Sequence, residues 1–157
     1  IRTAHSSVWM TAAYFVPTHE ELDALKAAAR RGVDVRILLP SHTDMPMILP
    51  VQRSYYGGLL RAGIKLYERR AGIVHSKSIV VDGVWSLVGS SNFDQRSVLF
   101  NDEVDVVVLG SSTADQLREY MQSDMRNARR IDWQFVHQQG TWQHVRALFW
   151  RLWQRLL

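Results

Sequence analysis

Residues 74–92, VHSKSIVVDGVWSLVGSSN, contain two β-branched runs on either side of Asp82-Gly83. An Asp-Gly pair between such runs is a strong signal for a β-hairpin with a two-residue loop. This loop places His75 opposite Ser90. Directly opposed residues share one face of a sheet, as do residues two apart along a strand. We therefore predict that His75, Lys77 and Ser90 point the same way.

The same register brings further polar groups to this face. Lys77 falls opposite Val88, and Asn92 continues the face beyond Ser90 if the strand persists. Gly89 has no side chain and lets a ligand or a backbone approach closely. An imidazole, an ammonium, a hydroxyl and an amide together suit an anion whose charge grows in the transition state, as a phosphoryl group's does. A histidine nitrogen can also attack phosphorus directly.

Two acidic residues are candidates to orient His75. Asp82 lies roughly 20 Å away along the strand, at about 3.3 Å per residue, so we assign Asp82 to the turn. Glu103 opens the next predicted strand. It is the better partner for the second ring nitrogen of His75, because a neutral imidazole needs a partner there.

The rest of the chain alternates strands and helices. A strand at 7–16, a helix that begins with the capping box Thr18-x-x-Glu21 and ends at Gly32, and a strand at 33–39 form a β-α-β unit with parallel strands. Further predicted elements are a helix at 51–61, strands at 64–68, 74–81 and 84–88, a buried strand at 103–109, and helices from about 111 to 130 and from 141 to 157. This pattern predicts a mixed, largely parallel sheet flanked by helices on both faces.

Composition limits the possible classes of protein. The 157 residues fit one domain with its own core. The chain has no cysteine, so disulfides and thiolate metal sites are excluded. No stretch is long and apolar enough to span a bilayer. The first residue is Ile1, so we expect the chain to be a piece of a longer protein.

Charge is uneven along the chain. Residues 1–125 carry 13 lysines and arginines against 14 acidic residues, whereas residues 126–157 carry six arginines against Asp132. In the last 17 residues, apolar side chains recur at helical spacing between arginines. We therefore divide the chain into a catalytic domain at 1–130 and a basic amphipathic tail helix at 131–157. Such a helix is typical of binding to an anionic membrane surface, and packing on the protein itself is the alternative.

The pattern His75-x-Lys77-x4-Asp82-x6-Gly89-Ser90-x-Asn92 resembles the HKD motif of the phospholipase D superfamily. Residues 92–103, with the segments at 14–17, 32–40 and 53–56, are similar to bacterial cardiolipin synthases in particular. The resemblance covers nearly the whole chain and corresponds to the C-terminal half of those enzymes. It implies a phospholipase D-like α/β/α sandwich.

The resemblance also implies roles for the motif residues. His75, Lys77 and Glu103 are the expected catalytic group, in which Glu103 holds His75. Lys77, Ser90 and Asn92 are the expected phosphate ligands. Asp82 and Gly89 belong to the motif as structural residues. No metal and no cofactor are expected, because histidines and lysines handle the charge.

The resemblance implies a reaction with two HKD motifs. One histidine forms a phosphohistidine, and the other protonates the leaving alcohol and deprotonates the incoming one. This chain has one motif, so we expect the second motif from an upstream half or from a homodimer mate. Both histidine roles remain open for His75, and the resemblance to the second half favours the acid/base role.

The expected function is phosphatidyl transfer between phospholipids of the cardiolipin synthase type. The expected substrate is phosphatidylglycerol or a similar lipid, at a bacterial inner membrane. Nucleic acid is not an expected partner. One alternative is a superfamily phosphodiesterase or nuclease that works as a homodimer, and another is a non-catalytic membrane-binding module.

Overall fold

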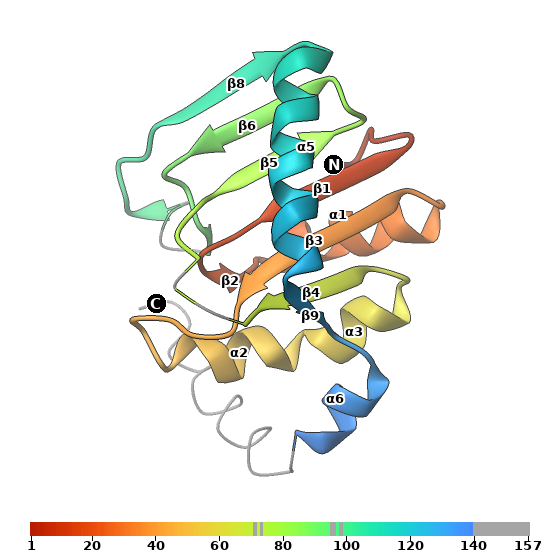
Figure 1. Cartoon of the computed structure of the whole chain (residues 1–157). Coiled ribbons are helices and arrows are strands. Elements are labelled where there is room, and N and C mark those ends of the chain that lie inside the picture. The colour runs from red at the N-terminus through yellow and green to blue at the C-terminus, as the bar shows by residue number, and fades with distance from the viewer. Residues whose placement is uncertain (71, 73, 95–96, 98, 140–157) are drawn as a thin grey trace.

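The computed structural model describes residues 1–139 except positions 71, 73, 95, 96 and 98. Seven strands form one mixed sheet in the order β8-β6-β5-β1-β3-β4-β9, and β2 pairs with β7 in a small second sheet (Figure 1). Parallel pairing joins β1, β3 and β4 at the centre. The flanking pairs are antiparallel, so that β6 runs in the same direction as the three central strands.

The predicted β-α-β unit is confirmed. It comprises β1 (Ser7–Thr11), α1 (His19–Arg30) and β3 (Asp34–Pro40). Thr18 and Glu21 form the capping box: the Glu21 amide donates to Thr18 Oγ1 at 3.2 Å, and the Thr18 amide donates to Glu21 Oε2 at 2.8 Å. The single strand predicted over 7–16 is interrupted, because its last residues form the separate strand β2 (Phe15–Val16) and pair with β7 (Phe93–Asp94).

The middle and the end of the chain differ from two predicted helices. The helix predicted over 51–61 is two short helices, α2 (Ile48–Ser54) and α3 (Tyr56–Arg61), followed by β4 (Lys65–Arg69). Helix α5 (Ser111–Arg126) ends earlier than predicted. The next residues form β9 (Ala128–Arg130), because the free edge of β4 offers backbone hydrogen-bonding groups with which this segment pairs.

The hairpin exists, but its predicted register is wrong by one residue. Strand β5 (Ser78–Val81) pairs with β6 (Trp85–Gly89) so that Val81 lies opposite Trp85 and not opposite Val84. The carbonyl of Val84 accepts a hydrogen bond from the amide of Gly110 at 2.7 Å. The Val84 amide still donates to the Val81 carbonyl at 3.2 Å across the Asp82-Gly83 turn. Val84 is therefore an extra, bulged residue that shifts the β5–β6 pairing beyond it by one position. Lys77 consequently pairs with Gly89, whose amide donates to the Lys77 carbonyl at 3.2 Å.

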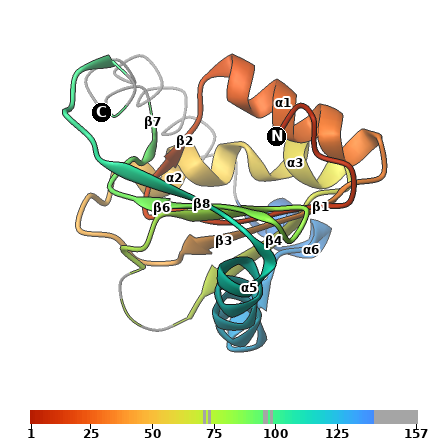
Figure 2. The ribbon, with the colours of Figure 1, turned by 90° about the horizontal axis from the view of Figure 1, so that it is seen from above.

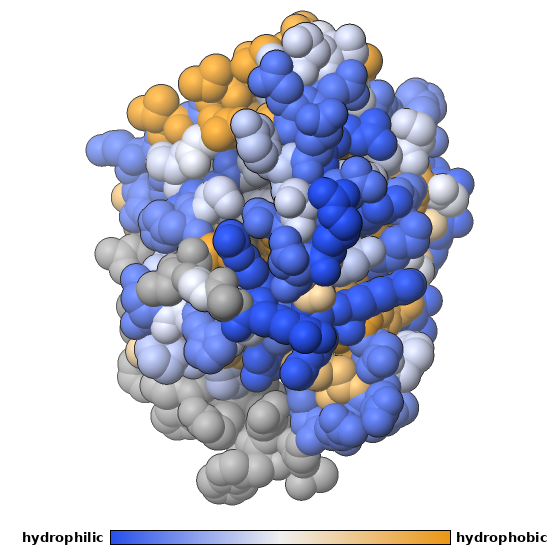
Figure 3. Space-filling model, in the orientation of Figure 1, coloured by the Kyte–Doolittle hydropathy of each residue, from blue (hydrophilic) through white to orange (hydrophobic). Residues whose placement is uncertain are grey.

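Strand β8 (Asp105–Leu109) is an edge strand and not the buried strand that its apolar sequence predicted. Val106, Val107 and Leu109 are 57%, 50% and 76% exposed. The apolar side chains along β8 form the orange patch at the top of Figure 3. A continuous apolar run is typical of a strand covered on both faces, and β8 has this sequence without that cover among the described elements.

Two layers of helices enclose the centre of the sheet. Helices α1, α2 and α3 lie on one face, and α5 lies on the other (Figure 2). The core on the α1 side includes Met10, Ile37 and Tyr56. The core under α5 includes Trp9 and Val80. The predicted mixed α/β sandwich with helices on both faces is therefore confirmed.

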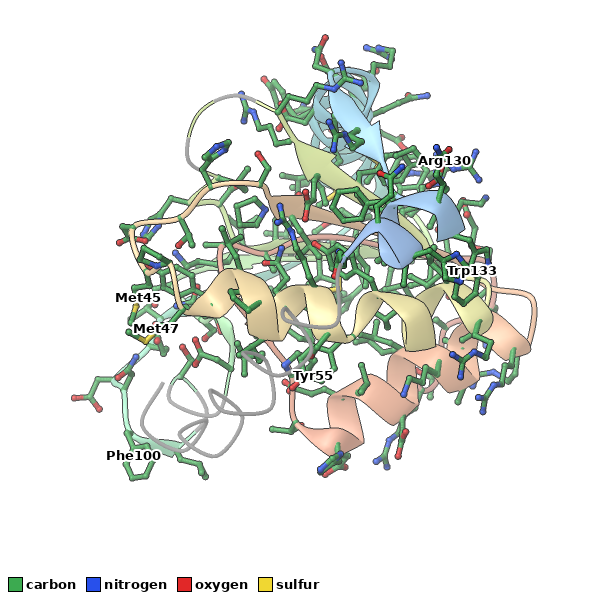
Figure 4. All side chains as sticks on the ribbon, turned by 90° about the horizontal axis from the view of Figure 1, so that it is seen from below. Met45, Met47, Tyr55, Phe100, Arg130 and Trp133 are labelled. Carbon is green, nitrogen blue, oxygen red and sulfur yellow. The ribbon has the colours of Figure 1, made fainter. Side chains whose placement is uncertain are left out.

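The described part of the C-terminal segment packs against the domain. Ile131 is 2% exposed, and α6 (Trp133–Gln138) lies beside α3. The Phe135 ring centroid lies 6.4 Å from that of Tyr56. Figure 4 shows Trp133 on α6 at the opposite end of the α2–α3 layer from Met45 and Met47. The rest of the predicted tail helix, from residue 140 onward, lies outside the described residues.

Gly89 gives a test of the β6–β8 contact. A Cβ at this position would lie 1.9 Å from Asp105 Oδ1 and 2.6 Å from Asp105 Cα, which is backbone. We expect Gly89→Ala to lower the free energy of unfolding by about 1–3 kcal/mol in urea denaturation. The matched control is Gly58→Ala in α3, where a Cβ would lie 3.8 Å from Lys26 Cε. The control should be neutral or more stable by about 0.5–1 kcal/mol. Equal stability of Gly89→Ala and wild type would contradict the contact.

Candidate active site

The candidate site lies at the side of the main sheet where the central parallel strands have their carboxyl ends. Strands β1 and β3 end at this side, and β5, which runs in the opposite direction, begins there. The parallel strands therefore deliver the loops that carry Tyr14 and Asp44 to the place where His75 and Lys77 precede β5. Ligand sites of open α/β sheets form at the carboxyl ends of strands for the same reason.

His75 is exposed and lies beside a tyrosine. Its ring meets the ring of Tyr14 edge-on, with centroids 6.4 Å apart. The Tyr14 hydroxyl donates to Asp44 Oδ1 at 2.6 Å. Burial and this hydrogen bond raise the pKa of Tyr14 to about 12. The pKa of Asp44 is lowered, chiefly by the Tyr14 hydrogen bond, with a smaller contribution from the charge of His75.

Sequence reasoning missed the pair of Tyr14 and Asp44 as part of this site. Tyr14 lies in a segment that was noted only as part of the family resemblance, and Asp44 lies in a loop with no regular pattern. Their role depends on contacts between loops that follow different strands. No local spacing signals such contacts.

Lys77 is the buried cation of the site, with a relative exposure of 9%. Its Nζ donates to the carbonyl oxygen of His75 at 2.9 Å, which ties the two motif residues together. Burial lowers the pKa of Lys77. The carboxylates of Glu103, Asp44 and Asp94 oppose this shift, because they stabilise the charged ammonium.

A cavity of about 250 Å³ opens beside Lys77. It is also lined by Ser91, Asn92, Ser97 and Asp105. Asn92 Oδ1 is buried and has no hydrogen-bond partner within the described part of the chain. An unpartnered buried polar atom in a cavity is a place where a ligand or a water molecule fits. The cavity thus places an ammonium and an amide around one space, as the sequence predicted for Lys77 and Asn92.

Ser90 lies beside the cavity and does not line it. The Ser90 hydroxyl donates to Glu103 Oε2 at 2.5 Å and accepts from the Val104 amide at 2.9 Å. The shifted hairpin register accounts for this position, since a slip of one residue moves a side chain to the other face. Ser91 lines the cavity in its place, with its hydroxyl donating to Asp105 Oδ2 at 2.5 Å.

Glu103 lies close to the motif residues. Hydrogen bonds from Ser90, Asn101 and Ser97 lower the pKa of its carboxyl, and the charge of Lys77 adds to the effect. Over the residues that the structure describes, no hydrogen bond joins Glu103 to His75. Glu103 is therefore bonded to Ser90 and interacts with the charge of Lys77, and its expected role as the partner of His75 stays a prediction.

Asp82 joins the hairpin turn to the start of β1. Its carboxylate accepts hydrogen bonds from the amides of His5 at 2.9 Å, Ser6 at 2.7 Å and Ser7 at 2.9 Å. The Ser6 hydroxyl donates to the same carboxylate at 3.0 Å. These hydrogen bonds hold the pKa of Asp82 well below its usual range against the effect of burial. The assignment of Asp82 to the turn therefore agrees with its position, with φ of 53°.

The site thus combines an exposed imidazole, a buried ammonium and an amide with an unpartnered oxygen. The imidazole and the ammonium can donate to an anionic substrate, whereas the Asn92 oxygen can only accept a hydrogen bond. Among the residues that the structure describes, no three histidine, aspartate or glutamate side chains are grouped to hold a metal ion.

A family model described as "Cardiolipin synthase, PLD-like domain" matches residues 1–125. The chain belongs to this family. The PLD-like domain contains the whole candidate site, from Tyr14 to Asp105.

Curated relatives extend this finding. A cardiolipin synthase of Geobacillus thermodenitrificans is 41% identical over 133 residues, which are 85% of this chain and 26% of that protein. A cardiolipin synthase 2 of Bacillus cereus is 34% identical over 157 residues, which are 100% of this chain and 30% of that protein. The chain therefore spans less than a third of the length of these relatives.

Solved structures share the fold. Nuc from Salmonella typhimurium, a phospholipase D family member, has a TM-score of 0.72 and 29% identity, and the match covers 83% of this chain and 84% of Nuc. Phosphatidylserine synthase from Haemophilus influenzae has a TM-score of 0.74 over 99% of this chain and 42% of that one. Its 13% identity supports the fold alone.

The hydrogen bonds of Asp82 predict a pH-dependent stability of the PLD-like domain. Because the pKa of Asp82 is lower in the folded state than in the unfolded state, its ionised carboxylate stabilises the fold at pH values above about 3.9, the pKa of an unfolded aspartate. This stabilisation is lost as the pH falls below that value. Asp82→Asn should therefore lower the free energy of unfolding by about 1–3 kcal/mol at pH 7, and the difference should shrink in acid.

The control for this measurement is Asp23→Asn, an exposed acidic residue on α1. Denaturant unfolding between pH 7 and pH 3 checks both variants. If the decrease in the free energy of unfolding caused by Asp82→Asn stays constant down to pH 3, or equals the decrease caused by Asp23→Asn, the stabilising role of Asp82 is contradicted.

Proposed function

We propose that this chain supplies one half of the active site of a phosphatidyltransferase of the cardiolipin synthase type. The observation that carries the proposal is the cavity that Lys77 and Asn92 line, with the exposed His75, two residues before Lys77, outside its lining. The buried ammonium fits a phosphodiester oxygen, and the Asn92 amide supplies a further polar group. The family membership and the identity to cardiolipin synthases support the choice of a lipid phosphodiester as substrate.

The proposed reaction has two displacements at phosphorus. In the first, a histidine nitrogen attacks the phosphodiester, a phosphorus–nitrogen bond forms, and the alcohol leaves with a proton from the second histidine. In the second, that histidine takes the proton of the acceptor alcohol, whose oxygen displaces the first histidine. Lys77 stabilises the charge on the phosphoryl oxygens in both steps. We assign the acid/base role to His75, and the nucleophile to a second HKD motif.

An open apolar face supports pairing with a second half. The β-sheet register aligns Ile79, Leu87 and Val107 in one row and Val81, Trp85 and Leu109 in the next. The preceding row contains Lys77, Gly89 and Asp105, so the face is continuous with the candidate site. Helix α5 packs on the opposite face of these strands.

No described helix packs on this apolar face over β6 and β8 (Figure 2). A partner that covers the face would bring its own groups to the row that contains Lys77. We propose a second PLD-like half as this partner, either from the same protein or from a second copy.

The lipid substrate implies an association with an anionic membrane surface. Across the part of the chain that the structure describes, none of the helices has the length and apolar character to cross a bilayer. We propose contact with the membrane surface, with the arginine-rich segment after residue 140 as its anchor.

The likeness to Nuc favours a second candidate, a phosphodiesterase that acts as a homodimer. Binding to anionic vesicles and to DNA over a salt series distinguishes the two. Lipid transfer predicts binding to vesicles, whereas a steep salt dependence for DNA without vesicle binding supports the phosphodiesterase.

The role of His75 is tested by His75→Ala in the complete protein. We expect phosphatidyl transfer to fall by about 10²–10⁴-fold, because the proton donor and acceptor is lost. Turnover of phosphatidylglycerol in vesicles measures the effect. The control is His19→Ala, an exposed histidine in α1, which should keep wild-type turnover. Unreduced transfer in His75→Ala refutes the catalytic assignment.

The open face is tested by Val107→Glu combined with Leu109→Glu in the complete protein. Two charges should prevent an apolar partner from covering this face, so we expect turnover to fall about tenfold or more. Circular dichroism checks that the variant remains folded. Tyr120→Glu is the control, since Tyr120 is 72% exposed on α5. Full turnover in the double variant would show that no catalytic half docks there.

A further inference from the structure

A second cavity lies at the same side of the sheet and shares no lining residue with the first. Its volume is about 520 Å³. The polar residues that line it are Ser41, His42, Arg53, Glu68, Arg70 and Arg129. Three guanidinium groups therefore surround one space that neither the HKD motif nor the proposed mechanism uses.

Among the described residues, one carboxylate lines this cavity, and it is already paired. Glu68 is 2% exposed and accepts hydrogen bonds from Arg53 at 2.8 and 3.0 Å. The Tyr56 hydroxyl donates to Glu68 Oε1 at 2.8 Å. Glu68 thus neutralises Arg53, which leaves the charges of the other two arginines unbalanced.

Arg70 and Arg129 have no acidic partner within the described residues. Arg129 lies directly opposite Glu68 in the β4–β9 pair, and its guanidinium carbon lies 5.6 Å from the centroid of the Phe135 ring. Both arginines are exposed, and both line the cavity. Two guanidinium groups around a cavity fit the oxygens of a phosphate, which arginine binds in a bidentate manner.

The chain connects this cavity to the candidate active site. The loop after β3 carries His42, which lines the second cavity, and Asp44, which bonds to Tyr14 beside His75. Arg70 follows β4 and precedes His75 by five residues. The two cavities are therefore neighbours along one side of the sheet.

We infer that the pocket of Arg70 and Arg129 binds the phosphate of the acceptor lipid, an inference that rests on the proposed function. After the first displacement, the transferred phosphatidyl group occupies the site of Lys77 and Asn92. An acceptor that is itself an anionic phospholipid needs a second cationic site for its own phosphate. Water and glycerol carry no phosphate and do not need this pocket.

The test is the combined variant Arg70→Gln and Arg129→Gln in the complete protein. Vesicles of phosphatidylglycerol with labelled glycerol in solution allow three products: cardiolipin, labelled phosphatidylglycerol and phosphatidic acid. All three products arise when an acceptor displaces the histidine from the same covalent phosphatidyl intermediate. Their ratio therefore reports only which acceptor the enzyme uses. We expect the share of cardiolipin to fall about tenfold or more, while total donor turnover stays within about twofold.

The matched control is Arg126→Gln with Arg130→Gln, which removes the same charge. Both arginines are exposed and lie outside the cavity, and Figure 4 shows Arg130 on the far side of the fold from Met45. The control should keep the wild-type product ratio. An unchanged ratio in the Arg70 and Arg129 variant, or an equal fall in the control, overturns the inference. Absence of all three products from the wild-type protein overturns the proposed function instead.

Inorganic phosphate distinguishes a lipid phosphate from a free one in the same assay. A site for the acceptor lipid predicts that added phosphate lowers the share of cardiolipin in the wild type and has no such effect in the variant. If phosphate changes total turnover at a constant product ratio, and the variant loses this response, then the pocket binds free phosphate and the lipid assignment is wrong.

Discussion

The contact between Gly89 and the backbone of β8 determines the geometry of the site. Because Gly89 has no side chain, β6 approaches Asp105 closely enough for the strands to pair, and the amide of Gly89 pairs with Lys77. Lys77, held in this pairing, lines the cavity. Asp82 fixes the other end of the hairpin through its hydrogen bonds to the backbone at the start of β1.

Local sequence signals predicted the parts of the fold that local interactions determine. The Thr18 capping box, the crossover from β1 to β3 and the hairpin around Asp82 all follow from short-range chemistry. The register of the hairpin did not follow, because Val84, whose carbonyl accepts from the amide of Gly110, 26 residues further along the chain, is a bulged residue between the turn and the β5–β6 ladder. β9 likewise depends on a free edge of β4, which propensity within the segment does not reveal.

In the candidate site too, local sequence predicted some features, and contacts between distant segments determined others. The HKD spacing was sufficient to bring Lys77 and Asn92 to one cavity, since both lie near the ends of strands of one hairpin. The Tyr14–Asp44 hydrogen bond joins two loops that follow different strands, and nothing in either loop announces it. The position of Ser90 beside Glu103, outside the cavity, follows from the shifted register. Residues of a strong motif are thus easier to identify than to orient.

The central claim is that Lys77 and Asn92 hold a phosphoryl group within reach of His75. A crystal structure of the complete protein with tungstate, a tetrahedral phosphate analogue, tests it most directly. Our account predicts the oxyanion in this cavity, within hydrogen-bond distance of Lys77 Nζ and the side-chain amide of Asn92, with a His75 ring nitrogen facing the metal centre of the anion. Tungstate bound elsewhere, with Lys77 and His75 facing away from it, would contradict the account.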